Sequence, residues 1–111
     1  ELDQYVRTNS KNGRIYPIKT DYASAVLSVP KKDGTKRLCV DYRQINRASK
    51  TVVYPMPRCD DLLEKTSRAQ FFSTLDLREA YHLLRVHPNS EKWTAFTCKM
   101  GTFAYRVMPL G

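Results

Sequence analysis

The dipeptide Asp33-Gly34 constrains the fold of this chain most strongly, because it lies between two runs with the pattern of strands. Those runs are residues 25–29 and 38–42. Asp-Gly is a strong signal for a tight β-hairpin turn, since glycine readily adopts the positive φ that such turns require. We therefore expect a two-stranded ribbon with this dipeptide at its tip.

The predicted tip is strongly basic. Residues 31–50 contain seven lysines and arginines against two acids, a net charge of +5, in a chain of 111 residues whose formal net charge is +8. This balance favours a polyanionic partner, with nucleic acid ahead of a membrane because no basic amphipathic helix is evident. Lysine binds phosphate as a point charge and arginine as a two-pronged fork, so such a loop can hold a triphosphate. Hairpin tips are also charged because they are solvated, and on charge alone that explanation is favoured.

The other segments predict short helices, hairpins and turns, which together indicate an α+β fold. Residues 44–58 show no regular pattern, and residues 71–77 predict a short, buried central strand. The further predictions, in chain order, are a helix over 2–12 that ends at Asn12-Gly13, an edge segment over 15–18, a helix over 60–67, a short helix or turn over 79–84, and a second hairpin formed by 93–98 and 102–108.

Asp76 is a lone carboxylate near the end of the apolar run 71–77. An acid in such a place is costly unless another group pairs with it or it ligates a metal. In the period-two geometry of a strand it shares a face with Phe72 and Thr74, away from the more apolar face, which suits a Mg²⁺ ligand. With Glu79 three residues later, Asp76 also fits a helix N-cap and its capping-box partner. Spacing favours the cap, and the two roles are not exclusive.

Aromatic residues follow this acid along the chain. Tyr81 lies five residues after Asp76, where its ring could stack on a sugar or exclude a 2′-hydroxyl. The alternative is a core tyrosine with a solvated hydroxyl. Trp93 and Phe96, further along the chain, are predicted to be core residues.

Other classes of site are disfavoured. The three cysteines are widely spaced and form no Cys-x-x-Cys pair, which argues against zinc and for an intracellular, reducing compartment. No apolar run approaches the roughly 20 residues of a membrane span, and no signal-peptide pattern begins the sequence, so we expect no membrane partner. Phosphate-loop, nucleophile-elbow and zinc-protease motifs are absent from the sequence.

Ordered blocks over nearly the whole chain carry a family resemblance. They are Tyr22-Ala23-Ser24-Ala25-Val26, Lys31-Lys32-Asp33-Gly34 with residues 37–46, Tyr54-Pro55-Met56-Pro57-Arg58 with residues 60–63, Phe72-Ser73-Thr74-Leu75-Asp76-Leu77-Arg78 with Tyr81-His82, Thr94-Ala95-Phe96, and Val107-Met108-Pro109-Leu110-Gly111. At these spacings the chain resembles the reverse transcriptases of gypsy-type long-terminal-repeat retrotransposons and of retroviruses. The resemblance implies a partial reverse transcriptase domain over 1–111, part of a right-hand polymerase. Residues 1–50 and 84–111 correspond to the fingers and 51–83 to the first part of the palm.

The resemblance also implies a metal site. Asp76 corresponds to the first of three catalytic aspartates and would bind Mg²⁺, with Mn²⁺ as the alternative ion. Leu77 would offer its backbone carbonyl to the same metal. The family uses two metal ions about 3.5–4 Å apart to activate the primer hydroxyl and to stabilise the leaving pyrophosphate.

Two further sets of binding residues follow from the resemblance. Residues expected to contact the incoming dNTP are Lys31, Arg37, Leu77 and Tyr81, and those expected to contact nucleic acid are Lys32, Lys36 and Arg43. The implied partners are an RNA or DNA template with its primer, dNTPs, and the remainder of a polymerase and RNase H polyprotein. The implied location is intracellular, in cytoplasmic virus-like particles, in the nucleus, or in both.

Departures from the family pattern qualify these expectations. Glu79-Ala80 stands where Ser-Gly is usual, and we expect the extra carboxylate to compete for Mg²⁺ or to repel the triphosphate. Leu110 replaces a retroviral glutamine. No aromatic-x-Asp-Asp turn occurs within these 111 residues, so we expect them not to polymerise alone. The alternative function is a truncated or co-opted remnant that binds nucleic acid non-specifically.

Overall fold

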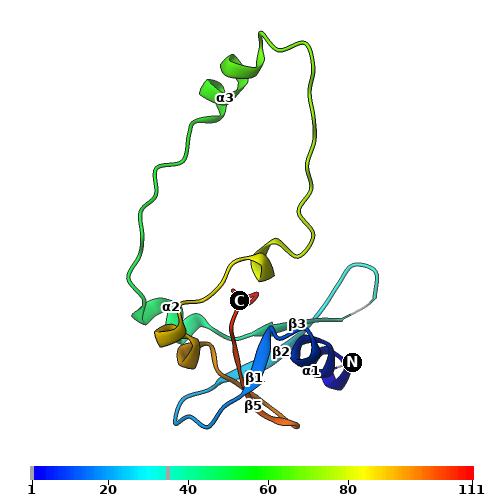
Figure 1. The fold of residues 1–111 in the computed structure, drawn as a ribbon, viewed down its shortest axis with the longest axis vertical. Helices are drawn as coiled ribbons and strands as arrows, with labels where there is room; N and C mark the ends of the chain where they lie inside the picture. The colour runs from blue at the N-terminus through cyan, green and yellow to red at the C-terminus, as the bar shows by residue number, and fades with distance from the viewer. Residues whose placement is uncertain (1, 35) are drawn as a thin grey trace. The chain divides into compact units, whose positions relative to one another are not determined.

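The structure is a computed structural model that describes residues 2–34 and 36–111, with the side chain of Arg37 outside the described part. The role expected of Arg37 therefore lies outside the described residues. The chain forms two compact units, Glu1–Ala48 with Glu79–Gly111, and Ser49–Arg78 (Figure 1). No helix in the described ranges is long and apolar enough to cross a membrane.

The first unit is built on a sheet of five short strands. In chain order they are β1 (Ile15–Pro17), β2 (Ser24–Pro30), β3 (Lys36–Val40), β4 (Phe96–Cys98) and β5 (Gly101–Tyr105). Their order across the sheet is β1-β5-β4-β2-β3, and all neighbours are antiparallel except β2 and β4, which are parallel. Both predicted hairpins are confirmed, and β1 forms an edge, as its proline predicts.

Short helices surround this sheet. They are α1 (Leu2–Lys11), α2 (Arg43–Ala48) and the 3₁₀ helices η1 (Ala80–Leu83) and η2 (Pro88–Thr94). Helix α1 ends where predicted, because Gly13 takes a φ of +68° and its amide donates to the Ser10 carbonyl. Helix α2 occupies part of a segment in which the sequence showed no regular pattern.

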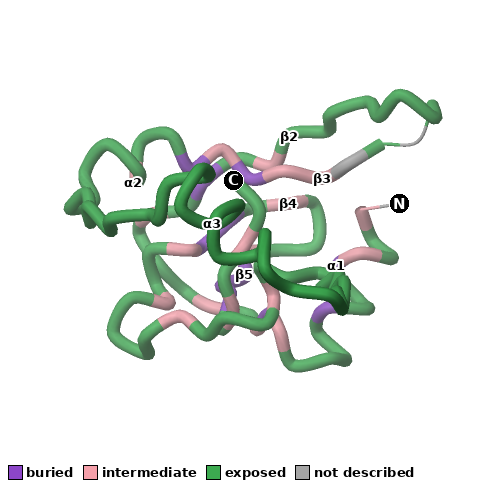
Figure 2. Tube along the Cα trace, turned by 90° about the horizontal axis from the view of Figure 1, so that it is seen from above, coloured by how far each residue is buried: buried purple, intermediate pink, exposed green. Residues whose placement is uncertain are grey.

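The core lies where α1 and β1 meet the strands β3, β4 and β5. Its buried apolar residues are Val6, Ile15, Val40, Tyr42, Phe96, Phe103 and Tyr105. Figure 2 shows buried stretches within the sheet and on α1, whereas the tip of the β2–β3 hairpin is exposed. The predicted core position of Phe96 is confirmed, with its ring centroid 5.2 Å from that of Tyr105. The prediction for Trp93 is wrong, because its side chain in η2 is 48% exposed and lies beside the ammonium of Lys92.

Buried tyrosine hydroxyls connect the helices to the sheet. The Tyr42 hydroxyl donates to the Thr94 carbonyl at 2.6 Å, and the Tyr5 and Tyr105 hydroxyls are 2.8 Å apart. The Tyr105 amide donates to the Thr94 hydroxyl at 2.8 Å. Burial raises the pKa of both Tyr42 and Tyr105, so these phenols remain neutral across the physiological range.

The second unit contains helix α3 (Cys59–Thr66). Every residue of this unit, Ser49–Arg78, is exposed. The prediction of a buried central strand over 71–77 is wrong. This run has no helix or strand, and the side chains of Phe71 and Leu75 are 93% and 91% exposed. Apolar residues form a strand only when a neighbouring strand accepts their backbone hydrogen bonds, and no described strand pairs with this run.

Candidate nucleotide and nucleic-acid site

The β2–β3 hairpin presents the predicted cationic tip. Pro30 pairs with Lys36 at the end of the ladder, and the Gly34 amide donates to the Lys31 carbonyl at 3.1 Å. Gly34 has a φ of +80°, the left-handed conformation for which the sequence predicted glycine. Lys31, Lys32 and Lys36 are all exposed on this projecting ribbon (Figure 1).

A hollow of about 290 Å³ is lined in part by residues of this ribbon and lies within the first unit. Its lining residues come from segments far apart in the sequence: Tyr5, Lys31, Lys36, Leu38, Glu79, Tyr81, His82 and Leu110. The fold thus places two ribbon lysines, Lys31 and Lys36, in the same hollow as Tyr81. The resemblance implies dNTP contacts for Lys31 and Tyr81, whereas it implies contact with nucleic acid for Lys36. Two ammonium groups beside an aromatic ring suit a ligand that joins phosphate to a flat organic part.

Main-chain pairing fixes the segment that carries Tyr81. The Met108 amide donates to the Leu84 carbonyl at 2.8 Å, and Arg85 forms an antiparallel bridge with Val107. Within η1, the His82 ring lies stacked on Tyr105 at a centroid distance of 6.3 Å, and its Nδ1 is 3.1 Å from the Met108 carbonyl oxygen. His82 also lines the hollow, a position that its spacing in the sequence does not predict.

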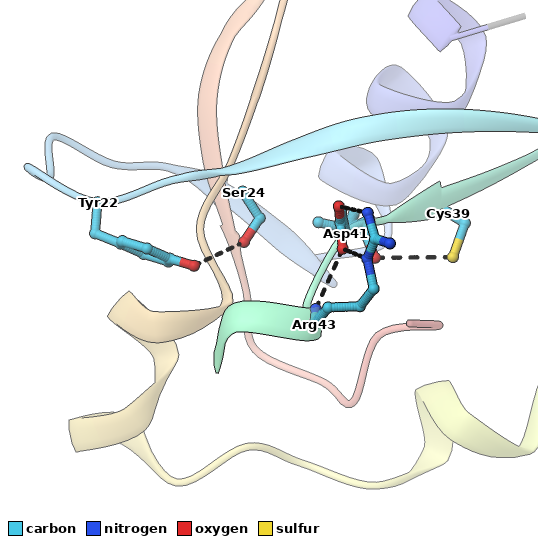
Figure 3. Close-up of polar contacts among 6 residues, drawn as sticks. Tyr22, Ser24, Cys39, Asp41 and Arg43 are labelled. Atoms are coloured by element: carbon cyan, nitrogen blue, oxygen red, sulfur yellow. Dashed lines mark hydrogen bonds and ion pairs between the residues drawn. The ribbon is translucent and has the colours of Figure 1, made fainter. Parts of the chain in front are cut away.

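Arg43 is held by a neighbouring acid (Figure 3). Its Nε and Nη2 donate to the two carboxylate oxygens of Asp41 at 2.8 and 2.7 Å, and its backbone amide donates to Oδ1 at 3.2 Å. These bonds lower the pKa of Asp41 to about 2. The Arg43 side chain remains 78% exposed, so a pre-oriented guanidinium faces solvent at the start of α2.

Asp76 and Leu77 belong to the second unit and are exposed. Asp76 makes no hydrogen bond or ion pair with any residue of the described part of the chain. Its predicted role as a helix cap is wrong, because the residue that precedes η1 is Glu79, which makes no side-chain capping bond. No group of three or more histidines, cysteines or acids that could hold a metal occurs among the described residues.

Glu79 forms an ion pair with Arg14 that the sequence did not indicate. This pair changes the effect that we expect the Glu79 carboxylate to have on Mg²⁺ or on a triphosphate. The Oε2 of Glu79 accepts a hydrogen bond from Nη2 of Arg14 at 2.5 Å. This bond lowers the pKa of the Glu79 carboxyl, which stays ionised. Because the two residues are 65 positions apart, no local sequence pattern reveals the pair.

A basic ribbon that contributes two lysines to a hollow with a tyrosine is an arrangement that can accept anionic ligands. The reverse transcriptase (RNA-dependent DNA polymerase) family matches residues 29–111. The chain is also 41% identical over 110 residues to the transposon Tf2-3 and Tf2-4 polyproteins of Schizosaccharomyces pombe. It therefore belongs to the reverse transcriptase family. The matched region covers 99% of this chain and 8% of those polyproteins.

Solved structures show the same fold. The prototype foamy virus protease-reverse transcriptase (a selenomethionine-labelled CSH mutant) is 25% identical, with a TM-score of 0.79 over 97% of this chain and 15% of that one. The foamy viral protease-reverse transcriptase dRH, solved in complex with double-stranded DNA, matches with a TM-score of 0.82 over 99% of this chain and 19% of that one, at 24% identity. The predicted class, an α+β part of a right-hand polymerase with hairpins and short helices, is confirmed.

Proposed function

We propose that this chain forms the dNTP-holding and template-contacting part of an RNA-directed DNA polymerase from a retrotransposon polyprotein. The observation that carries the proposal is the hollow that gathers Lys31, Lys36 and Tyr81. The two lysines would neutralise the triphosphate and the negative charge that develops during phosphoryl transfer. Arg37 is proposed for the same role from the family resemblance alone.

Tyr81 is proposed to select the sugar. Its side chain is 51% exposed at the wall of the hollow, where the ring can contact a nucleotide. An aromatic ring packed against the 2′ position excludes a hydroxyl there and so favours deoxyribonucleotides. Lys32 and Arg43, both exposed, are proposed to contact template or primer phosphates.

Asp76 and the Leu77 carbonyl are proposed ligands of Mg²⁺ or Mn²⁺. An exposed carboxylate without a described partner is a suitable hard oxygen ligand. Bound metal ions in such an enzyme supply activation of the primer hydroxyl and stabilisation of the leaving group. Since no group of three or more potential metal-binding side chains occurs among the described residues, we propose that additional polypeptide supplies further ligands.

The second unit supports a partnership with the remainder of the polyprotein. Large apolar side chains that are at least two-thirds exposed there are Val52, Val53, Tyr54, Met56, Leu63, Phe71, Phe72, Leu75 and Leu77. So many exposed apolar residues in one segment mark a surface that other polypeptide covers. We propose that residues 1–50 and 84–111 serve as fingers and 51–83 as the first part of the palm.

Equilibrium binding of dATP to the purified chain tests the nucleotide site. We expect Lys31→Gln with Lys36→Gln to weaken dATP binding roughly tenfold or more, since each removes a charge-assisted contact to phosphate. Lys19→Gln with Lys11→Gln is the matched control, because both lysines are exposed and neither lines the hollow. Equal losses in the two double variants would refute a specific site. Tyr81→Ala should reduce the preference for dATP over ATP.

The exposed basic ribbon favours one second candidate, non-specific nucleic-acid binding by a remnant of the polymerase. Affinity for duplex that is insensitive to dATP, with no measurable dATP binding, would select this candidate. Either function is proposed to operate inside the cell, in cytoplasmic virus-like particles, in the nucleus, or in both. The three free cysteines, Cys39, Cys59 and Cys98, support a reducing compartment.

A further inference from the structure

The Arg14–Glu79 ion pair joins the turn after α1 to the residue that precedes η1. Arg14 Nη2 and Glu79 Oε2 are 2.5 Å apart, and the side chains are 23% and 59% exposed. Neither residue belongs to the lysine and tyrosine set that holds the nucleotide in the proposed function. The proposed function therefore gives this ion pair no role.

Arg14 is fixed in place by its backbone. Its amide donates to the Asn9 carbonyl at 2.9 Å, while the Gly13 amide donates to Ser10, the bonding pattern of a glycine-capped helix end. The Arg14 carbonyl accepts from the Arg106 amide at 2.9 Å, next to the β1–β5 ladder. Nη1 of Arg14 also donates to Oδ1 of the buried Asn9 at 3.5 Å. The guanidinium thus extends from an anchored main chain.

Glu79 is held in an unfavourable backbone conformation. Its φ and ψ are 51° and 42°, the left-handed region, and it is the one described residue other than glycine with positive φ. A residue with a Cβ adopts this conformation at a cost, so a compensating contact is required. The Glu79 carbonyl then accepts from the His82 amide at 2.9 Å, which starts the η1 turn that carries Tyr81.

Glu79 contributes to the walls of two hollows that have residues in common. One is the proposed nucleotide hollow, and the other, of about 280 Å³, includes Arg14 among its lining residues. Glu79 and Lys36 line both. An uncompensated carboxylate at this wall would repel a triphosphate held by the lysines.

We propose that Arg14 and Glu79 are a positioning pair: the guanidinium holds Glu79 and the η1 turn, and so sets Tyr81, while it shields the bound triphosphate from the Glu79 carboxylate. This inference rests on the proposed function for its ligand, but the geometry of the pair stands without it.

The test compares Arg14→Met, Glu79→Gln and the double variant. The probes are inorganic tripolyphosphate, dATP and ATP, added without metal. We expect Arg14→Met to weaken tripolyphosphate binding about three- to tenfold, because a carboxylate is left facing the anion. Glu79→Gln should bind at least as well as the wild type, and the double variant should recover most of the affinity lost in Arg14→Met. Both single variants should lower the preference for dATP over ATP.

Equal weakening by both single variants, or no recovery in the double variant, would overturn the shielding role. An unchanged dATP preference in both single variants would overturn the positioning of Tyr81. A purely structural pair would lower the melting temperature of both single variants without this asymmetry in binding.

A readout without nucleotide separates this inference from the proposed function. The His82 amide donates to the Glu79 carbonyl at the start of η1, and its exchange should be faster in Arg14→Met than in the wild type. If the wild type binds no polyphosphate, the proposed function and the shielding role both fail. Exchange of the His82 amide then decides the structural part, which an unchanged exchange rate in Arg14→Met would overturn.

Discussion

Removal of the three exposed ribbon lysines should change the salt dependence of nucleic-acid binding by a calculable amount. Lys31, Lys32 and Lys36 are all exposed on the β2–β3 ribbon, and in the absence of dNTP we expect all three to contact duplex phosphates. Each phosphate that a lysine neutralises on duplex DNA contributes about −0.9 to the slope of log K against log salt. Replacement of all three by glutamine should therefore make the slope less negative by about 2.7.

This change in slope corresponds to a large difference in affinity. Between about 50 and about 200 mM salt, the wild type should lose roughly 40-fold more affinity than the triple variant. The assay is fluorescence anisotropy of a labelled primer–template duplex titrated with the chain at several salt concentrations. Because the lysines are exposed and bear no core contacts, circular dichroism should show the same fold in both proteins.

A matched control distinguishes a defined ribbon from diffuse positive charge. Arg7, Lys11 and Lys19 are also exposed cations of the first unit, and none lies on the β2–β3 ribbon. Their replacement by glutamine lowers the net charge by the same three units and should change the slope by less than one. If both triple variants changed the slope equally, the reasoning from ribbon geometry would be refuted.

Three further predictions concern stability. Phe96→Ala should cost about 3–5 kcal/mol of unfolding free energy, because the ring is 1% exposed in the core, and chemical denaturation would measure this loss. Gly111→Ala should destabilise by roughly 1–3 kcal/mol, because the new Cβ would lie 2.5 Å from the carbonyl oxygen of Val40; an unchanged melting temperature would contradict this contact. The Asp41–Arg43 pair lowers the carboxyl pKa from 3.8 to about 2, so the folded chain binds fewer protons in this interval. Its stabilisation should be present above about pH 4 and lost as pH falls towards 2, and Arg43→Met should reduce that pH dependence in acid-unfolding curves.

Local sequence signals were sufficient to predict several elements of the fold. Asp33-Gly34 predicted the ribbon, and Asn12-Gly13 predicted the end of α1, because both depend on glycine conformations set within a few residues. The basic character of the tip also follows from sequence alone. The order of the family blocks identified the lineage, which the 41% identity to the Tf2 polyproteins and the family match over residues 29–111 confirm.

The pattern of apolar residues gave a wrong prediction where a strand is stable only if neighbouring strands pair with it. The alternation over 71–77 predicted a buried strand, yet Phe71 and Leu75 are almost fully exposed and unpaired. A strand is completed by hydrogen bonds from its neighbours, so its sequence shows only that it could be buried. In the same way, the predicted cap at Asp76 required a helix start that the chain forms at Glu79 instead.

Only the tertiary structure decided which residues line the hollow and that Glu79 is paired with Arg14. Lys36, Tyr81 and Leu110 meet there because the order of the sheet brings together segments that are far apart in the chain. Arg14 reaches Glu79 across 65 positions, which changes an isolated acid into half of an ion pair. Sequence determines the conformations that neighbouring residues impose on one another, whereas charge pairing between distant residues depends on distances that exist only after the chain has folded.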